Sequence, residues 1–175
     1  MFTVVNRLYS IEITEASSET WHPDVKFFHV LKDGILIAKF YLDIFARDHK
    51  RGGAWMADCR VRRRLPDGHL QLPVAFLTCN FSSPTADTPS LLTHAEVTTL
   101  FHEFGHGLHH MLTEVEVAAV SGINGVSWDA VELPSQFLEN WCWQEESLAM
   151  ISRHHETGES LPKVLLDKML AAKHF

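Results

Sequence analysis

Two histidines and a glutamate form the most informative chemical pattern in the sequence, His102-Glu103-Phe104-Gly105-His106. Residues i and i+4 lie on one face of an α-helix, so both imidazoles can reach one ion, and Glu103 lies beside them where it can hold a water. In a chain with 12 histidines among 175 residues, roughly 0.06 such H-E-x-x-H matches are expected by chance. The pattern therefore predicts a metal site. The alternative is a pair of ordinary surface or core histidines.

A third ligand must come from another element. His109 lies seven residues after His102, roughly 10 Å of rise on a straight helix, which is too far for two Zn–N bonds of about 2.0–2.1 Å to a shared ion. Glu132, 26 positions after His106, opens the next predicted helix and is the candidate. A His₂Glu set with an open position is typical of catalytic zinc. The alternative role for Glu132 is a first-turn carboxylate favoured by the helix dipole.

Four nearby positions have weaker assignments. Glu139 lies two helical turns beyond Glu132, where it could accept a hydrogen bond from a ligand imidazole and fix its tautomer, although a solvated glutamate explains it equally well. Asp129 is predicted to be an N-cap. Gly105 and Gly107 each cost about 1 kcal/mol relative to alanine inside a helix, so they predict close packing against a neighbouring element.

The first half of the chain carries the strand signals. Residues 25–46 form two β-rich runs around the turn pair Asp33-Gly34, which predicts a hairpin. A second turn pair, Asp67-Gly68, separates a basic cluster from the β-rich run at 72–81. These signals predict a small antiparallel sheet within residues 21–81.

The second half carries the helix signals. From residue 93 apolar side chains recur with a helical period, and Thr93 followed by Glu96 is a capping-box signature, so the sequence predicts a helix over 93–112. A second helix is expected to begin between 129 and 134, with the H-E-x-x-H and third-ligand helices together covering 93–150. A further helix is expected over 161–172. The predicted fold class is α+β, mainly α in the second half.

Composition excludes several classes of protein. The length favours one domain, and a net charge of −7 with a pI near 5.9 argues against a nucleic-acid groove, which needs a basic stripe. The arginine cluster at 60–64 is interpreted as a solvated hairpin face. No apolar run approaches the roughly 20 residues that span a bilayer. Three widely spaced cysteines fit buried thiols in a reducing compartment, which favours a cytoplasmic location.

Several motifs in the same order resemble the thimet oligopeptidase family of zinc metallopeptidases. The resemblance rests on residues 102–110, 121–122 and 132–141, with supporting stretches at 21–25, 40–43, 50–56, 77–81 and 156–159. It covers nearly the whole chain from about Trp21 onward. It implies that residues 1–175 are part of a gluzincin-type catalytic domain that is incomplete at both ends.

The resemblance also implies roles for individual residues. His102, His106 and Glu132 would bind one Zn²⁺, and Glu103 would be the general base that takes a proton from zinc-activated water during hydrolysis of short peptides. The strand near Gly53 and Ala54 could pair with the substrate backbone; the alternative is a tight structural turn. Neither a nucleic acid nor a membrane is expected as a partner.

Members of that family are several times longer, and a later helical segment supplies tyrosine and histidine donors to the reaction intermediate. The tyrosines of this chain, Tyr9 and Tyr41, lie upstream of the predicted zinc helix and do not match those donors. Two hypotheses therefore remain: an oligopeptidase core that is active with the rest of the polypeptide, or a truncated or split-chain zinc-binding module that is inactive without a complementary chain. A helical interaction domain with incidental histidines is the non-metal alternative.

Overall fold

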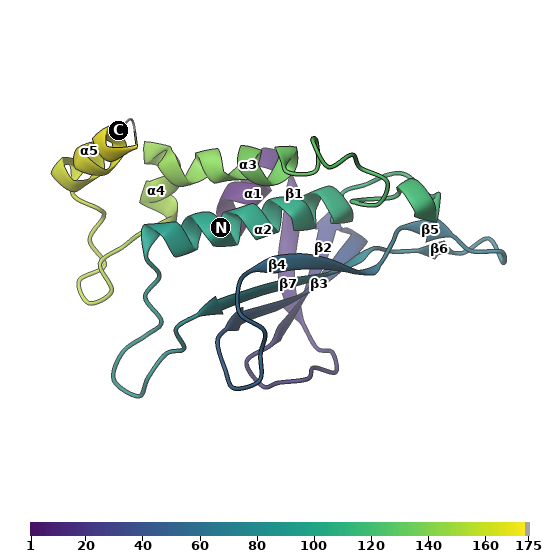
Figure 1. The fold of residues 1–175 in the computed structure, drawn as a ribbon, viewed down its shortest axis with the longest axis horizontal. Coiled ribbons are helices and arrows are strands. Elements are labelled where there is room, and N and C mark those ends of the chain that lie inside the picture. Colours follow the sequence, from purple (N-terminus) through teal and green to yellow (C-terminus); the bar gives the residue numbers. More distant parts are fainter. Residues whose placement is uncertain (174–175) are drawn as a thin grey trace.

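The computed structural model describes residues 1–173 and has one five-stranded sheet with the long helix α2 lying across one face (Figure 1). The elements in chain order are α1 (Phe2–Tyr9), β1 (Ile11–Ala16), β2 (Lys26–Lys32), β3 (Ile35–Phe45), β4 (Trp55–Arg60), β5 (Arg63–Arg64), β6 (Leu70–Gln71), β7 (Val74–Phe81), α2 (His94–Met111), α3 (Leu133–Glu139), α4 (Glu145–Ile151) and α5 (Lys163–Ala172). Short 3₁₀ turns occupy Ala118–Val120 and Asn140–Trp143. The α+β class is confirmed.

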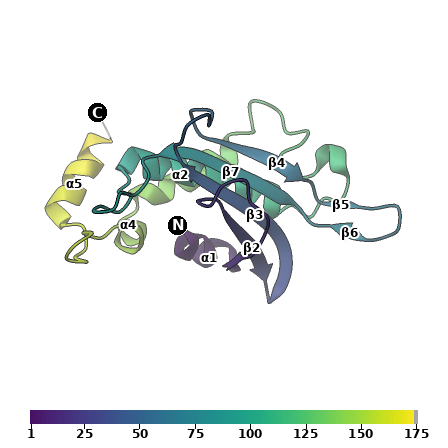
Figure 2. The same ribbon diagram turned by 90° about the horizontal axis from the view of Figure 1, so that it is seen from below.

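The sheet is mixed, which corrects the prediction of an antiparallel one. Its strand order is β1-β2-β3-β7-β4, and β7 runs parallel to β3 while the other neighbours are antiparallel. The turn pair Asp67-Gly68 closes only the small β5-β6 hairpin, which forms a separate sheet at one end of the molecule (Figures 1 and 2). The chain therefore crosses over before β7 pairs with β3, and β4 becomes an edge strand.

The hairpin predicted for residues 25–46 is confirmed as β2 and β3. Asp33 and Gly34 have φ values of 51° and 75°, the left-handed pair that a two-residue hairpin turn requires. Side chains alternate between the two faces of these strands, so Phe28 and Phe40 stack on the face that α2 covers. The aromatic rings of Phe27 and Tyr41 contact each other on the opposite face.

Helix α2 begins as its cap predicts. The Thr93 side chain accepts from the Glu96 amide and the Glu96 carboxylate accepts from the Thr93 amide, which completes the capping box. Phe101, Phe104, Leu108 and Met111 are buried against the sheet and the short helix α1. Helix α1 and strand β1 lie in a segment for which the sequence pattern predicted no element.

The second predicted helix is broken. It begins at Leu133 with Glu132 at the N-cap, so the assignment of Asp129 as N-cap is wrong. After Glu139 the helix changes to a 3₁₀ turn, and Gln144 has an extended backbone before α4 begins. Trp141, Cys142 and Trp143 all pack on the core, so the apolar pattern of the sequence continues through the 3₁₀ turn. The periodicity of apolar residues therefore does not reveal the break. Helix α5 matches the last prediction closely.

Two surface expectations have mixed outcomes. Arg62 and Arg64 of the basic cluster donate to Glu116, and most of the cluster is exposed. Cys79 and Cys142 are buried free thiols, but Cys59 is exposed on the edge strand β4, which corrects the expectation of three buried thiols. Among residues 1–173, no helix has the length and apolarity needed to cross a membrane.

Candidate metal and catalytic site

Helix α2 brings His102, Glu103 and His106 to one place. The rings of His102 and His106 lie one turn apart with centroids separated by 4.9 Å and planes inclined by 83°. The His106 side chain is only 10% exposed, whereas that of His102 is 27% exposed. The spacing of i and i+4 on a continuous helix is what places the two imidazoles side by side.

Glu132 meets both imidazoles from the N-terminus of α3. Its Oε2 atom lies 3.2 Å from Nε2 of His102 and 3.1 Å from Nε2 of His106. Ser135, one turn later, donates a hydrogen bond to the same Oε2 at 3.0 Å and so orients the carboxylate. The carboxylate makes no capping hydrogen bond within the described part of α3 and faces the two imidazoles instead.

The approach of α3 to α2 depends on Gly105. A Cβ at this position would lie 2.6 Å from Cα of Ser135 and 2.7 Å from the carbonyl oxygen of Pro134. Any side chain would push α3, and Glu132 with it, away from the histidines. Gly107 makes the corresponding approach to Leu77 of β7. The prediction of close packing at both glycines is confirmed.

These residues fit a metal ion by their chemistry. One ligand atom from each of His102, His106 and Glu132 lies within 4.8 Å of the others. Burial lowers the pKa of His106, an effect that the nearby Glu132 partly offsets, so the imidazole is favoured in the neutral form that binds metals. Within residues 1–173 the buried Nδ1 atom of His106 has no hydrogen-bond partner, whereas its Nε2 atom faces Glu132.

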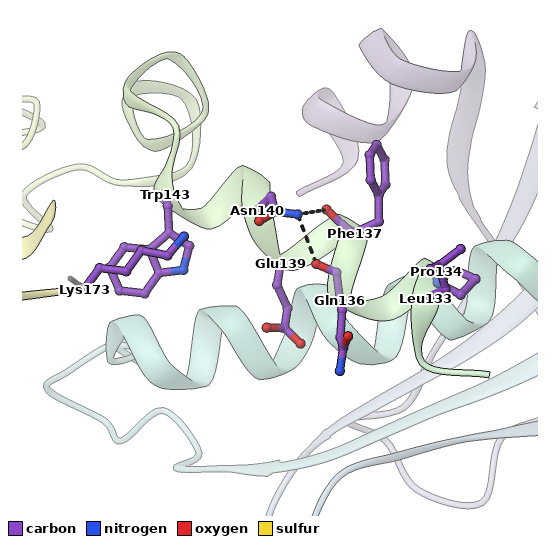
Figure 3. Close-up of a pocket in the computed structure, with 8 residues that line it drawn as sticks. All are labelled: Leu133, Pro134, Gln136, Phe137, Glu139, Asn140, Trp143 and Lys173. Carbon is purple, nitrogen blue, oxygen red and sulfur yellow. Dashed lines mark hydrogen bonds between the residues drawn. The ribbon is translucent and has the colours of Figure 1, made fainter. Parts of the chain in front are cut away.

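Glu139 forms a hydrogen bond with Nδ1 of His102, the ring nitrogen that does not face Glu132. Its Oε1 atom lies 2.5 Å from Nδ1 of His102, and the side chain extends from α3 toward α2 (Figure 3). A proton on Nδ1 leaves the lone pair of Nε2 facing Glu132, the tautomer that a metal ligand needs. This geometry favours a positioning role for Glu139 over a freely solvated glutamate.

Glu103 is buried beside the histidines. Burial raises the pKa of its carboxyl group, and the charge of Glu132 adds to the rise, while the nearby His102 and the main chain at Met56 oppose it. The carboxyl group faces a cavity of about 560 Å³ that also contains the three candidate ligands. A buried carboxylate with a raised pKa at a cavity wall is suited to accept and return a proton.

The edge strand β4 forms a wall of this cavity. Ala54, one of the two candidate substrate-pairing residues, lines it together with Trp55 and Met56. Gly53 is not among the lining residues: its φ is +93° and its carbonyl accepts a hydrogen bond from Asn80, as the tight-turn alternative predicts. The two positions therefore differ, with a turn at Gly53 and an open strand edge from Ala54 onward.

Several residues of the site were not found from the sequence. Ser135 orients Glu132, and apolar side chains of the segment before α3 complete the cavity wall: Ile123, Val126, Trp128 and Val131. A serine three residues after the candidate ligand, in the first helical turn, is a local signal that could have identified Ser135. The apolar wall has no local signal, because it forms only when the segment folds back over α2.

Comparison with known proteins decides the family. The family model described as peptidase family M3 matches residues 1–175. The chain belongs to peptidase family M3. Oligopeptidase A of Salmonella typhimurium is 62% identical over 177 residues, covering 100% of this chain and 26% of that protein. Oligopeptidase A of Haemophilus influenzae is 58% identical with the same coverage.

More distant M3 relatives also align along the whole chain. The organellar oligopeptidase A of Arabidopsis thaliana is 46% identical over 183 residues, covering 100% of this chain and 23% of that protein. The chain thus spans about a quarter of the length of the curated relatives it matches. The resemblance to the oligopeptidase family stated from the motifs is confirmed.

Proposed function

We propose that this chain carries the catalytic centre of a zinc-dependent endopeptidase that hydrolyses short peptides. The observation that carries the proposal is the meeting of His102, His106 and Glu132 beside the buried Glu103 in one cavity. Membership of peptidase family M3 supports it. A helix bearing H-E-x-x-H, with a glutamate at the N-cap of a following helix, supports the proposal of a gluzincin-type centre.

The chain's own residues divide the chemistry among them. His102, His106 and Glu132 would hold the ion, which when bound lowers the pKa of a coordinated water toward about 7 and polarises the substrate carbonyl. Glu103 accepts a proton from a water in the cavity and later delivers it to the leaving amine. Glu139 fixes the tautomer of His102, and the exposed edge at Ala54 offers main-chain groups to an extended peptide.

The test is Glu103→Gln in a polypeptide of family length that contains this chain. Glutamine keeps the size of the side chain but cannot take the proton, so zinc content should stay at one ion per chain while peptide cleavage falls by at least about 10²-fold. Glu114→Gln, on an exposed residue away from the cavity, is the matched control. Cleavage by Glu103→Gln at the control rate would contradict the proposal.

A second candidate is a zinc-binding module that is inactive alone. Neither tyrosine lines the cavity, since Tyr41 contacts Trp21 and Phe76 on the far face of the sheet and Tyr9 lies at another pocket. A donor aimed at the developing oxyanion, whose loss costs about 10²–10³ in rate where measured, would then come from a complementary chain. Chelator-sensitive hydrolysis of a peptide mixture by the purified chain alone would contradict this candidate.

We also propose a cytoplasmic location. All three cysteines are free thiols, as in a reducing compartment. A relative described as a probable cytosolic oligopeptidase A, from Arabidopsis thaliana, is 44% identical over 183 residues and 26% of its length. Fractionation of cells that produce the chain, with a cytoplasmic marker followed in parallel, tests this; recovery in another compartment would contradict it.

A further inference from the structure

A buried lysine lies at the end of strand β3, away from the candidate metal ligands. The side chain of Lys50 is 5% exposed, and its ammonium donates to the carbonyl oxygens of Asp43, Phe45 and Cys79 at 3.0, 2.7 and 2.6 Å. It also donates to the Asp43 carboxylate at 2.8 Å. A buried ammonium is tolerated only when it is paired and its protons have acceptors, and this one has both.

The carbonyls that Lys50 contacts lie where the sheet is irregular. The parallel register of β3 and β7 pairs Asp43 with Thr78 but then Phe45 with Phe81, so it slips between these two positions. A register slip interrupts the ladder and leaves main-chain groups without their strand partners. The Lys50 ammonium bonds to carbonyls of both strands at this point and holds together the ends of β3 and β7.

Asn80 of β7 links this strand to the loop that follows Lys50. Its Nδ2 atom donates to the carbonyl oxygens of Arg51 and Gly53, at 2.8 and 2.6 Å. Lys50 and Asn80 thus fix both sides of the short loop 51–53. The left-handed φ of +93° at Gly53 then turns the chain into β4. We call Lys50, Asn80 and this loop the β4 clamp.

Strand β4 is the wall that the clamp positions. Ala54, Trp55 and Met56 follow the clamped loop directly and line the cavity with the candidate ligands and Glu103. Its strand neighbour in the described part of the chain is β7, which carries Asn80. Met56 and Glu103 line the same cavity, so a displacement of β4 would alter both the cavity wall and the surroundings of the candidate base.

We infer that Lys50 and Asn80 are positioning residues for the peptide substrate, acting through the main chain of the edge strand β4. They touch neither the substrate nor the reacting atoms; they determine where the open edge of β4 lies relative to Glu103. The consequence for catalysis rests on the proposed function, whereas the effect on β4 itself does not.

The sharpest variant is Asn80→Asp. Aspartate has the same shape but replaces the amide donor with an oxygen that faces two carbonyl oxygens, so it should release the loop without opening a cavity. Asn80 is only partly buried, and the variant is expected to fold. Asn6→Asp is the matched control, because Asn6 also donates to a carbonyl, that of Ile11, at 2.8 Å, but in the α1-β1 connection.

The first measurement is amide hydrogen exchange in the 175-residue chain. Asn80→Asp should increase exchange of the amides at 53–57 by at least about 10-fold over the control, while its zinc affinity stays within twofold of the unmodified chain. Equal exchange at 53–57 in Asn80→Asp and Asn6→Asp would overturn the clamp. This readout needs no peptide hydrolysis.

The second measurement is steady-state cleavage of a short peptide by a family-length polypeptide carrying each variant. Loss of main-chain contacts to the substrate should raise KM by about 5–10-fold, with a smaller change in kcat. An unchanged KM together with faster exchange would reduce the clamp to a structural role and overturn the inference. If the unmodified polypeptide cleaves no peptide, the proposed function fails, and the exchange measurement alone then decides the clamp.

Lys50→Met is the complementary variant. It removes the ammonium that donates to three main-chain carbonyls and leaves the Asp43 carboxylate with Arg47 and Trp21 as its remaining donors, so it is expected to destabilise the whole sheet. For this reason Asn80→Asp carries the test. Where Lys50→Met remains folded, it should increase exchange at the same amides; exchange no faster than in the Asn6→Asp control would overturn the role of Lys50.

Discussion

The candidate site depends on which nitrogen of each histidine is occupied. His102 has Nδ1 bound by Glu139 and Nε2 facing Glu132, so its two ends are held by carboxylates from opposite ends of α3. His106 faces the same oxygen of Glu132, with its other nitrogen buried. An imidazole whose outer nitrogen is hydrogen-bonded to a carboxylate is a better oriented and more basic ligand. Affinity for a metal should therefore depend on Glu139 as well as on the three ligands.

Glu139→Gln is expected to weaken zinc binding by about 10–100-fold, because the amide cannot stabilise the required tautomer as a carboxylate does. Competition between the chain and a chelator of known affinity measures this effect. Glu145→Gln is the control, since Glu145 is exposed and pairs loosely with Lys163 at 3.6 Å. Equal zinc affinity in the two variants would show that Glu139 is only a surface carboxylate.

Within each helix the candidate residues could be predicted from the sequence because their spacing is local, whereas the meeting of Glu132 with the two histidines is tertiary. His102, Glu103 and His106 follow from helical spacing, and Glu132 and Glu139 share a face two turns apart. Ser135 and Met56 could not be assigned, because their roles arise from the tertiary approach of α3 and β4 to α2. The same holds for Lys50, whose partners include the carbonyl of Cys79, 29 positions later in the chain.

Asp43 is expected to make the free energy of unfolding depend on pH. Burial by itself would raise the pKa of this carboxyl, but hydrogen bonds from Arg47, Lys50 and Trp21 outweigh that effect and lower the pKa to about 2, from an ordinary value of 3.8. Because the pKa of Asp43 is lower in the folded chain than in the unfolded chain, its ionised carboxylate stabilises the fold at pH values above the unfolded pKa. This stabilisation is lost as the pH falls from about 4 through about 2. The loss should amount to about 2 kcal/mol.

Denaturant unfolding between pH 5 and pH 2 measures this dependence in the metal-free chain. Asp43→Asn should be less stable at pH 5 and should lose less stability than the unmodified chain as the pH falls. Asp87→Asn, in the exposed loop before α2, is the control and should follow the unmodified chain. Parallel curves for Asp43→Asn and the control would contradict the assignment.

At the scale of elements, the decisive contact is that between α2 and α3. Helix α2 contributes two candidate ligands and Glu103, while α3 contributes Glu132 from its N-cap and Glu139 from its last turn. Gly105 permits the backbones to approach, and Gly107 seats α2 on β7. The site therefore exists only at one separation of these two helices.

Gly105→Ala should destabilise the chain by about 1–3 kcal/mol, since the clash with the α3 backbone exceeds the roughly 1 kcal/mol that alanine adds to a helix. Zinc affinity should also fall, because the added methyl displaces Ser135 and Glu132. Chemical denaturation and zinc titration check both effects. Gly52→Ala is the control, because a Cβ there meets nothing within 4 Å. A Gly105→Ala chain as stable as this control would contradict the described packing.

The elements themselves were predictable where signals are local. The capping box gave the start of α2, and the Asp33-Gly34 pair gave the β2-β3 hairpin. The parallel pairing of β3 with β7 could not be predicted, because Val74–Phe81 carries the same alternation whichever neighbour it joins. The break after Glu139 could not be predicted either, because the apolar residues of the 3₁₀ turn could pack on the core equally well from an α-helix.

At the scale of the whole molecule, α3 leaves an apolar face uncovered. Leu133 is 74% exposed and Phe137, one turn later, is 52% exposed. They line a groove of about 860 Å³ that continues along α3 to Trp143 and Lys173 (Figure 3). The groove lies on the helix that supplies Glu132 and Glu139. Large apolar side chains exposed one turn apart on one helix favour association with another surface.

The 175-residue chain is therefore expected to self-associate at micromolar concentrations, and the double variant Leu133→Lys, Phe137→Lys should remain monomeric. Sedimentation velocity over a concentration series measures the change. Ile35→Lys is the control, because Ile35 is as exposed but stands alone beside the hairpin turn. The same association in the double variant and the control would show that the α3 face is not the contact.

Zinc stoichiometry of the purified chain tests the central claim most directly. The account predicts one zinc per chain by elemental analysis after dialysis, retained in His109→Ala and lost in His106→Ala and in Glu132→Ala. His109 is the matched control, because it lies on the same helix but outside the candidate ligand group. Absence of stoichiometric zinc from the unmodified chain, or its retention in His106→Ala, would contradict the account and favour a helical interaction domain with incidental histidines.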